Sequence, residues 1–202
     1  MTQSNPFASR FIRPGAIDYI FPKGQSAESL VAGLRASEWV GEIVGPHGSG
    51  KSTLVAALIP TLKAAGRKVV QRVITPDAGD RAGCIVPAGA FAAISKLPLD
   101  KDTQLILDGF ERLSWWWRRR VRVHCRRLQA GLLVTAHESM GLPLLVQTRP
   151  TTELAQQIVE RLLPPGDATI KPSDVQAAFT KSDRNLRETL FALFDVYQAR
   201  RT

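Results

Sequence analysis

One short stretch of the chain combines the residues that bind phosphate in proteins. It runs Gly45, Pro46, His47, Gly48, Ser49, Gly50, Lys51, Ser52 and Thr53, and it matches the pattern G-x-x-x-x-G-K-[ST] at every fixed position. Glycines let the backbone of such a loop turn several N–H groups toward one anion. We expect Lys51 to reach the β- and γ-phosphates and Ser52 to bind Mg²⁺. The stretch therefore predicts a nucleotide site, with ATP and Mg²⁺ as its ligands.

Polar side chains follow two further apolar runs. Asp108 comes after residues 105–107, and Thr135 ends the run 132–134. A carboxylate in this place suits Mg²⁺, and the alternative is a carboxylate that caps a turn. We expect Asp108 to be the second metal ligand, beside Ser52. For Thr135 two roles stay open, because a strand-end hydroxyl either contacts the γ-phosphate or only satisfies the backbone around it.

Hydrolysis of a triphosphate also requires a base that orients the attacking water. The candidates are Glu111, three positions after Asp108, and Glu138, with Glu111 favoured. Either carboxylate can equally be a solvated surface group. Arg184 and Arg187 open the last expected helix one turn apart, where an arginine could reach over the γ-phosphate. The alternative is a pair of solvated arginines.

The spacing of apolar segments along the chain predicts the strands and helices that carry these residues. Five strands are expected, over residues 39–44, 68–75, 103–107, 132–135 and 144–147. Helical segments alternate with most of them, so we expect an α/β fold of the P-loop NTPase kind, with three αβα layers and a mainly parallel sheet. Ligands of such sheets bind at the carboxyl ends of the strands, where Gly45, Asp108 and Thr135 fall.

The two ends of the chain have a different character from this core. Prolines interrupt the aromatic-rich residues 1–24, which predicts an extended N-terminal arm that lies on the core or lines an adenine pocket. After residue 150 only helical patterns occur. We therefore expect an arm over residues 1–24, a nucleotide-binding core over 25–150 and a small all-α lid over 151–202.

The composition is that of a globular chain with a basic surface. Of the 202 residues, 44% are hydrophobic and 22% are charged, and the formal net charge is +9. This charge is compatible with a polyanionic partner. Cys84 and Cys125 lack the spacing of metal ligands, so we expect reduced, buried thiols. No run has the length of a membrane span, and residues 1–10 contain no apolar h-region of a signal peptide, so we expect a soluble, cytoplasmic protein.

The most unusual local composition lies within an expected helix over residues 111–130. Three tryptophans, Trp115 to Trp117, precede three arginines, and four more basic positions follow up to Arg127. Leu113, Trp117, Val121 and Leu128 are expected to face the sheet, and Arg119, Arg122 and Arg126 to form a second stripe with Trp115. The stretch Arg118–Arg127 is either a solvated basic face or a patch for nucleic-acid phosphates or an acidic protein.

Taken together, these motifs resemble the AAA+ family of ATPases. The resemblance rests on the phosphate loop, or Walker A motif, on Asp108 as the Walker B acid and on Thr135 as a sensor-1-like residue. The run from Asn185 to Arg187 resembles the sensor-2 segment of clamp loaders and origin initiators, which implies a sensor-2 role for Arg187. The pair that begins with Arg13 resembles the linker that contacts adenine in those relatives.

Two departures from the family pattern affect the expected activity. Many of these ATPases carry Glu directly after the Walker B Asp, where this chain has Gly109. Only residues 137–143 separate the last two strands, which is too short for the helix that carries the arginine finger. We therefore expect a monomer or low oligomer rather than an active ring. The expected function is an ATPase that couples nucleotide state to lid position and to a partner, and the alternatives are a small-molecule kinase or a non-hydrolysing regulator.

Overall fold

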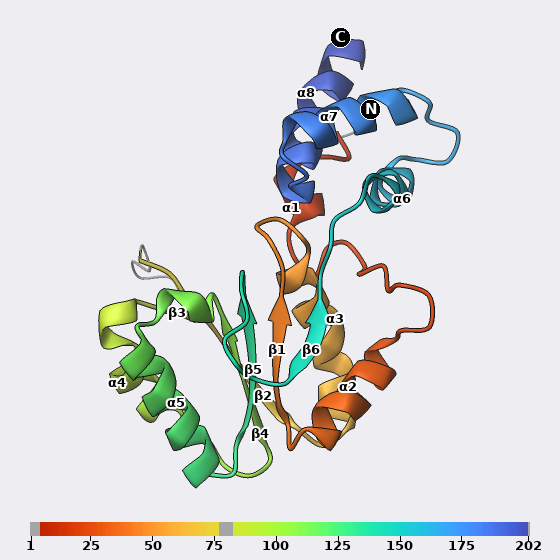
Figure 1. Ribbon diagram of the computed structural model, residues 1–202. Coiled ribbons are helices and arrows are strands. Elements are labelled where there is room, and N and C mark those ends of the chain that lie inside the picture. Colours follow the sequence, from red (N-terminus) through yellow and green to blue (C-terminus); the bar gives the residue numbers. More distant parts are fainter. Residues whose placement is uncertain (1–4, 77–82, 202) are drawn as a thin grey trace. The chain divides into compact units, whose positions relative to one another are not determined.

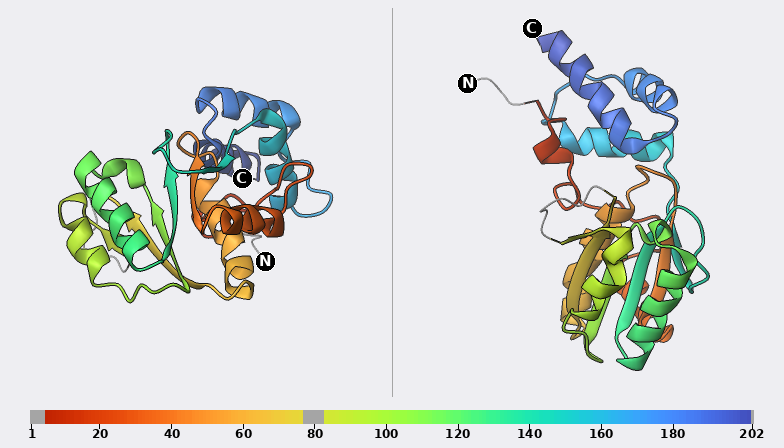
Figure 2. Two further views of the ribbon diagram at one scale, coloured as in Figure 1. Left: turned by 60° about the horizontal axis from the view of Figure 1, so that its bottom comes forward. Right: turned by 90° about the vertical axis from the view of Figure 1, so that its left-hand side faces the viewer.

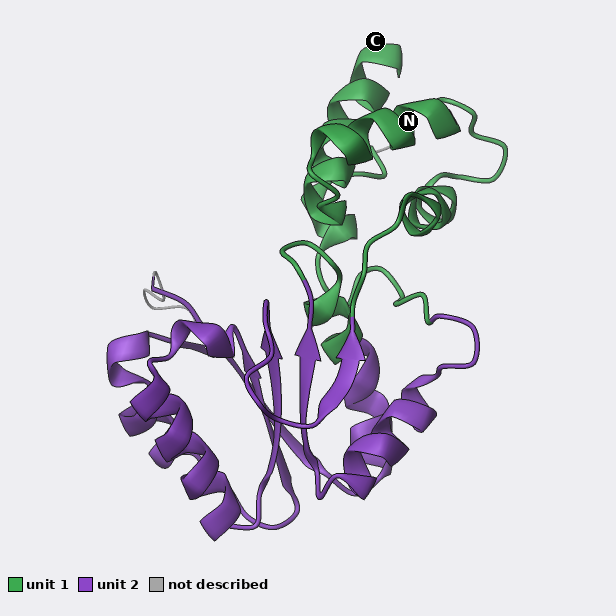
Figure 3. Ribbon diagram, in the orientation of Figure 1, with its two compact units in different colours: residues 1–21, 46–56, 148–202 green, residues 22–45, 57–147 purple. Residues whose placement is uncertain are grey.

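A computed structural model describes residues 5–76 and 83–201, and these form two compact units (Figure 3). One unit contains residues 22–45 and 57–147, and it is called the sheet unit below. The other contains residues 46–56 and 148–202 with the N-terminal residues up to Phe21, and it is called the loop–lid unit. The expected division into arm, core and lid stays a prediction.

The sheet unit is built on parallel strands, in the order β3-β2-β4-β5-β1-β6 (Figure 1). Their bounds are β1 Val40–Val44, β2 Lys68–Ile74, β3 Cys84–Ile85, β4 Thr103–Asp108, β5 Gly131–Ala136 and β6 Leu144–Gln147. All five ladders between them are parallel. The α/β class and the five predicted strands are confirmed. The described residues add a sixth, two-residue strand, β3, on the outer edge of β2.

Helices cover both faces of this sheet (Figures 1 and 2). On one face lie α4 (Ala90–Ser95) and α5 (Trp115–Arg127), preceded by short 3-10 turns at Pro87–Gly89 (η1) and Phe110–Arg112 (η2). On the other lie α2 (Ala27–Ala36) and the part of α3 (Lys51–Ala64) from Ala57 on. The strands read as nearly continuous apolar runs because both faces are covered. Strand β5 is buried at all its residues.

Local sequence signals explain where these helices begin and end. Ser26 and Ser29 form a reciprocal capping box at the start of α2, as the serines of this segment predict. Helix α3 runs through Pro60 and stops before Gly66, whose φ of +82° suits a residue that ends a helix. The basic helix begins later than expected, at Trp115, because residues 110–112 form the separate turn η2.

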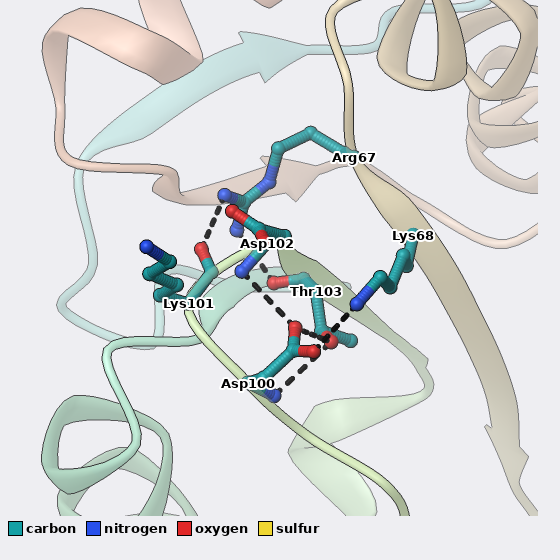
Figure 4. A network of polar contacts seen from close by, with 6 residues as sticks. All are labelled: Arg67, Lys68, Asp100, Lys101, Asp102 and Thr103. Atoms are coloured by element: carbon teal, nitrogen blue, oxygen red, sulfur yellow. Dashed lines mark hydrogen bonds and ion pairs between the residues drawn. The ribbon is translucent and has the colours of Figure 1, made fainter.

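The N-terminal ends of β2 and β4 are joined by a polar network (Figure 4). Arg67 donates to the carbonyl oxygens of Lys101 and Thr103 at 2.6 and 2.5 Å, and its guanidinium lies 4.6 Å from the Trp39 ring centre. Asp100 accepts from Lys68 Nζ at 2.7 Å, a contact that holds the pKa of the Asp100 carboxyl at about 2. The network pairs polar groups at the edge of the sheet where the strands begin.

The loop–lid unit has its own apolar core. It contains α1 (Ser9–Ile12), the first residues of α3, and the helices α6 (Thr152–Leu162), α7 (Pro172–Lys181) and α8 (Leu186–Arg201). Phe7 of the arm is fully buried among the lid helices, with its ring 5.8 Å from that of Tyr197. Asn5 also donates to the Phe194 carbonyl at 3.0 Å. The first part of the arm therefore contributes to the lid core, and the prolines limit its helix to four residues.

Candidate nucleotide site

The phosphate loop has the backbone geometry that its sequence predicts. Gly48 and Gly50 have φ angles of +67° and +89°, which L side chains rarely adopt. Helix α3 begins directly at Lys51 and has no acidic residue in its first turn. The Lys51 side chain is 9% exposed, and its Nζ donates to the Pro46 carbonyl at 2.8 Å. This lysine therefore lies over its own loop, and the loop and helix start fit a phosphate group.

Two residues of the segment 148–202 contact this loop within the loop–lid unit. A Cβ atom at Gly48 would lie 1.8 Å from Asn185 Oδ1, so the Asn185 side chain occupies the space that any larger residue at position 48 would need. Thr148 is 3% exposed, and its hydroxyl is 2.7 Å from that of Ser49. Neither Asn185 nor Thr148 was singled out as a site residue from the sequence, because nothing local links positions so far apart.

Asn185 also caps helix α8. Its Oδ1 accepts hydrogen bonds from the backbone N–H groups of Arg187 and Glu188, at 3.0 and 3.2 Å. An asparagine before an apolar helical pattern is the sequence signal for such a cap. The Arg187 side chain is exposed, and its guanidinium lies 5.6 Å from the Phe191 ring centre. The cap therefore joins the first turn of α8, which carries Arg187, to the phosphate loop.

The arm contributes an aromatic side chain beside the same loop. A Cβ atom at Gly50 would lie 3.8 Å from Tyr19 Cε2, and the Tyr19 ring meets Phe21 edge to face at 4.9 Å. Burial raises the pKa of the Tyr19 hydroxyl above its usual value. Arg13 is exposed at the end of α1. Tyr19 of the arm therefore lies against Gly50 of the loop. The expected role of Arg13 stays a prediction.

The sheet unit gathers the other predicted residues at the carboxyl ends of β4 and β5. The Thr135 hydroxyl donates to Asp108 Oδ1 and accepts from the Gly109 N–H, at 3.2 Å for the second bond. Thr135 is fully buried. Its hydroxyl therefore orients the Asp108 carboxylate, and whether it also senses a γ-phosphate stays a prediction.

Gly109 cannot be replaced by glutamate, the residue that many AAA+ ATPases carry after the Walker B Asp, without a change of backbone. Its φ is +84°, and a Cβ atom there would lie 2.8 Å from the Ile74 carbonyl oxygen. Real Cβ atoms do not approach a backbone oxygen so closely, and neither atom is at the end of a flexible side chain. The departure from the Asp-Glu pair thus follows from the way the chain leaves β4.

Glu111 lies on the turn η2 and is held by a histidine. Its Oε1 is 3.4 Å from His137 Nδ1, and the Glu111 side chain is 19% exposed. Among the described residues, its buried Oε2 has no hydrogen-bond partner. Glu138 is exposed by contrast. Of the two candidate bases, Glu111 is thus the half-buried one that a neighbouring side chain holds.

The basic helix α5 faces the sheet with different residues from those expected. Leu113 and Val121 are buried as predicted, but Leu128 is 37% exposed beyond the helix end, so its expected place against the sheet is wrong. The predicted place of Arg122 on one stripe with Arg119 and Arg126 is also wrong. Arg122 is half-buried and donates to the Met140 carbonyl. The helical periodicity could not show that the Met140 carbonyl, in the loop after β5, lies within reach of Arg122.

The remaining expected features have mixed outcomes. Burial raises the pKa of the Cys125 thiol to about 12, whereas Cys84 is only half-buried. Within residues 5–76 and 83–201, no helix is both long and apolar enough to cross a membrane. The same described residues contain no group of three or more His, Cys, Asp or Glu side chains that could hold a metal ion. A small-molecule kinase would also need an acidic site for its acceptor, and the sequence offers Asp77 and Asp80 for it, but both lie outside the described residues.

Comparison with known proteins identifies the fold. No family model matches the sequence, and no curated protein matches it. A chain of Drosophila ORC, in a structure of ORC bound to DNA, is similar over 100% of this chain and 66% of its own length, with 16% identity and a TM-score of 0.53. C. elegans PCH-2 is similar over 91% of this chain and 71% of its own, with 14% identity and a TM-score of 0.47. At 16% identity the likeness to the ORC chain concerns the fold alone, which is a parallel α/β fold similar to AAA+ domains.

Proposed function

We propose that this chain is an ATP-binding switch, in which the phosphate loop reports its occupancy to the lid helices. One observation carries the proposal: Asn185 packs against Gly48 of the loop and at the same time caps α8. A phosphate bound by the loop would lie beside this cap. The likeness to AAA+ ATPases supports a nucleotide-dependent protein of this kind.

The roles of the site residues follow from their chemistry. Lys51 is proposed to bind the β- and γ-phosphates, Ser52 and Asp108 to bind Mg²⁺, and Arg187 to respond to the γ-phosphate from the first turn of α8. Bound Mg²⁺ would neutralise charge on the phosphates. The Tyr19 ring beside Gly50 suits an adenine base, and Arg13 is proposed to assist it.

Slow hydrolysis is proposed for this site. Glu111 is the proposed base, since His137 holds its Oε1 and its buried Oε2 has no hydrogen-bond partner among the described residues. It stands on a different turn from the glutamate that many AAA+ ATPases carry directly after the Walker B Asp, because a Cβ atom at position 109 would collide with the Ile74 carbonyl oxygen. The absence of a glutamate at position 109 also favours a second candidate, a regulator that binds ATP without turnover. The expected cytoplasmic location stays a prediction.

Hydrogen exchange with and without ATP tests the switch. We expect wild-type protein to bind ATP with Mg²⁺ and the amides in the first turn of α8 to exchange more slowly when it does. Lys51→Ala should bind at least tenfold more weakly, because the loop loses its cation. Asn185→Ser keeps an oxygen that caps α8 but withdraws from Gly48, so it should bind ATP and lose the protection of α8.

Thr151→Ser is the matched control, because Thr151 caps α6 through its hydroxyl and the change preserves that cap. This variant should behave as wild type. Protection of α8 that is unchanged in Asn185→Ser would contradict the coupling, and absence of ATP binding in the wild type would contradict the function as a whole. ATP turnover in the presence and absence of Mg²⁺ then separates the hydrolysing from the non-hydrolysing switch.

A further inference from the structure

Helix α5 exposes two large aromatic side chains that contribute little to the core. Trp115 and Trp116 are 60% and 70% exposed, and their rings meet edge to face at 4.7 Å with an interplanar angle of 80°. Tryptophan is among the side chains that gain most from burial. The third tryptophan shows the ordinary behaviour, since Trp117 stacks on Phe91 with ring centres 5.9 Å apart. The exposed pair is therefore not explained by packing.

Each exposed tryptophan begins a stripe of exposed arginines. Arg119 and Arg126 follow Trp115 by four and eleven positions, and Arg120 and Arg127 follow Trp116 by the same intervals. At 3.6 residues per turn, these intervals return to the same side of a helix. All six side chains are exposed. They form what is called below the tryptophan–arginine face: Trp115, Trp116, Arg119, Arg120, Arg126 and Arg127.

The half-buried arginines of α5 have a structural role, because they donate to backbone carbonyl oxygens. Arg118 donates to the carbonyl oxygens of Leu113 and Glu111, at 2.6 and 3.2 Å, and Arg122 donates to that of Met140. The outward arginines include one engaged with aromatic rings, Arg120, whose guanidinium lies 4.5 Å from the Phe91 ring centre. Favourable charge at the helix C-terminus accounts for Arg126 and Arg127. It does not account for Arg119 beside two exposed tryptophans.

The face also lacks compensating negative charge along its own segment. From Arg112 to His137 the sequence contains no Asp or Glu. Glu111, at the start of this segment, is only 19% exposed and faces His137. A uniformly cationic surface with two aromatic rings at one end is complementary to a polyanion that also offers flat apolar groups.

We propose that the tryptophan–arginine face binds single-stranded nucleic acid. The arginines would contact successive phosphates, and Trp115 and Trp116 would stack with unpaired bases. An acidic protein would account for the arginines but not for the adjacent indoles. A duplex would match the charge, but its bases are already stacked on one another. Stacking accepts every base, so the binding is sequence-independent and strongly weakened by salt.

Binding of a fluorescent oligothymidylate of about 16 nucleotides tests this proposal, because such a length spans a typical single-strand site. Titrations over a series of salt concentrations give the affinity and its salt dependence. The double variant Trp115→Ala with Trp116→Ala should lose about tenfold in affinity for each base that loses its stacking partner. Arg119→Gln with Arg126→Gln should lower the slope of log affinity against log salt by about 0.7 for each phosphate contact removed.

Arg35→Gln with Lys63→Gln is the matched charge control, because both side chains are exposed on other helices of the sheet unit and the same charge is lost. It should bind as wild type. The proposal is overturned if the tryptophan variant binds oligothymidylate like wild type, or if polyglutamate competes as well as oligothymidylate. It is equally overturned if the wild type is a dimer that the tryptophan variant converts to a monomer, since the face would then bind a second copy.

Discussion

Two positions in this protein have no room for a side chain. Gly48 and Gly109 both have positive φ angles, and a Cβ atom at either would collide, with Asn185 in one case and with the Ile74 carbonyl in the other. The two collisions differ in kind. The Asn185 contact is with a side chain that can move, whereas the Ile74 contact is with backbone of strand β2. Position 109 is therefore the more restrictive of the two.

An Asp-Glu pair at positions 108 and 109, of the kind that many AAA+ ATPases carry, should damage the protein rather than activate it. We expect Gly109→Glu and Gly109→Ala to lower the free energy of unfolding by more than ~1–2 kcal/mol, the cost of left-handed backbone alone, and not to raise ATP turnover. Gly66→Ala is the control, because its φ of +82° matches but nothing lies within 4 Å of the added Cβ. Urea unfolding measures both. Faster turnover in Gly109→Glu at wild-type stability would show that the missing carboxylate, and not space, limits this site.

At the scale of elements, a buried carboxylate shapes the short connection between β5 and β6. Glu42 in β1 is 1% exposed and accepts hydrogen bonds from Ser139 Oγ at 2.6 Å and from the N–H groups of Met140 and Leu142 at 2.7 and 3.3 Å. Parallel strands usually need a connection of a dozen or more residues. Residues 137–143 cross β1 without a helix, as the sequence predicts, and Glu42 supplies the acceptors that a helix would have supplied internally.

Removal of this carboxylate should loosen the connection. Glu42→Ala leaves three donors without their acceptor, so we expect a loss of at least ~1–3 kcal/mol, the cost of one unsatisfied buried polar group. Glu42→Gln keeps one acceptor oxygen and should lose less. Thermal unfolding gives the stability, and hydrogen exchange of residues 139–142 shows whether the loop opens. Wild-type protection of those amides in Glu42→Ala would contradict this role.

At the scale of the molecule, the phosphate loop belongs to the same compact unit as the C-terminal helices. The loop contacts Thr148 and Asn185 there, on either side of the helices α6 and α7 in the sequence. The described residues 137–143, between β5 and β6, also form no helix in the place where AAA+ ATPases usually carry the arginine finger. These two features favour a switch that works within one chain over one that works between subunits.

Turnover should therefore not depend on assembly. We expect the ATP turnover per chain to stay constant, within about twofold, as protein concentration rises, since no residue of a second copy is required for the proposed chemistry. Steady-state turnover measured beside analytical ultracentrifugation checks this expectation. A nucleotide-dependent hexamer whose turnover per chain rises steeply with concentration would contradict it.

Local patterns in the sequence predicted what depends on near neighbours. Apolar runs placed the strands, Ser26 marked the start of α2, and the spacing of residues 45–52 predicted the glycine-rich loop and the helix that follows it. These features are set by backbone preferences and by burial on both faces of a sheet, which adjacent residues record. Much of the fold could be predicted for this reason.

Only the tertiary structure decided which distant residues meet. It placed Asn185 against Gly48, turned Arg122 toward the Met140 carbonyl and left Leu128 exposed. It also showed that Gly109 is a requirement of the backbone beside Ile74. Such contacts join residues far apart in the sequence and depend on sheet order and on the shape of loops. Local sequence patterns therefore do not predict them. The sequence alone determined the phosphate loop, and tertiary packing determined which residues surround it.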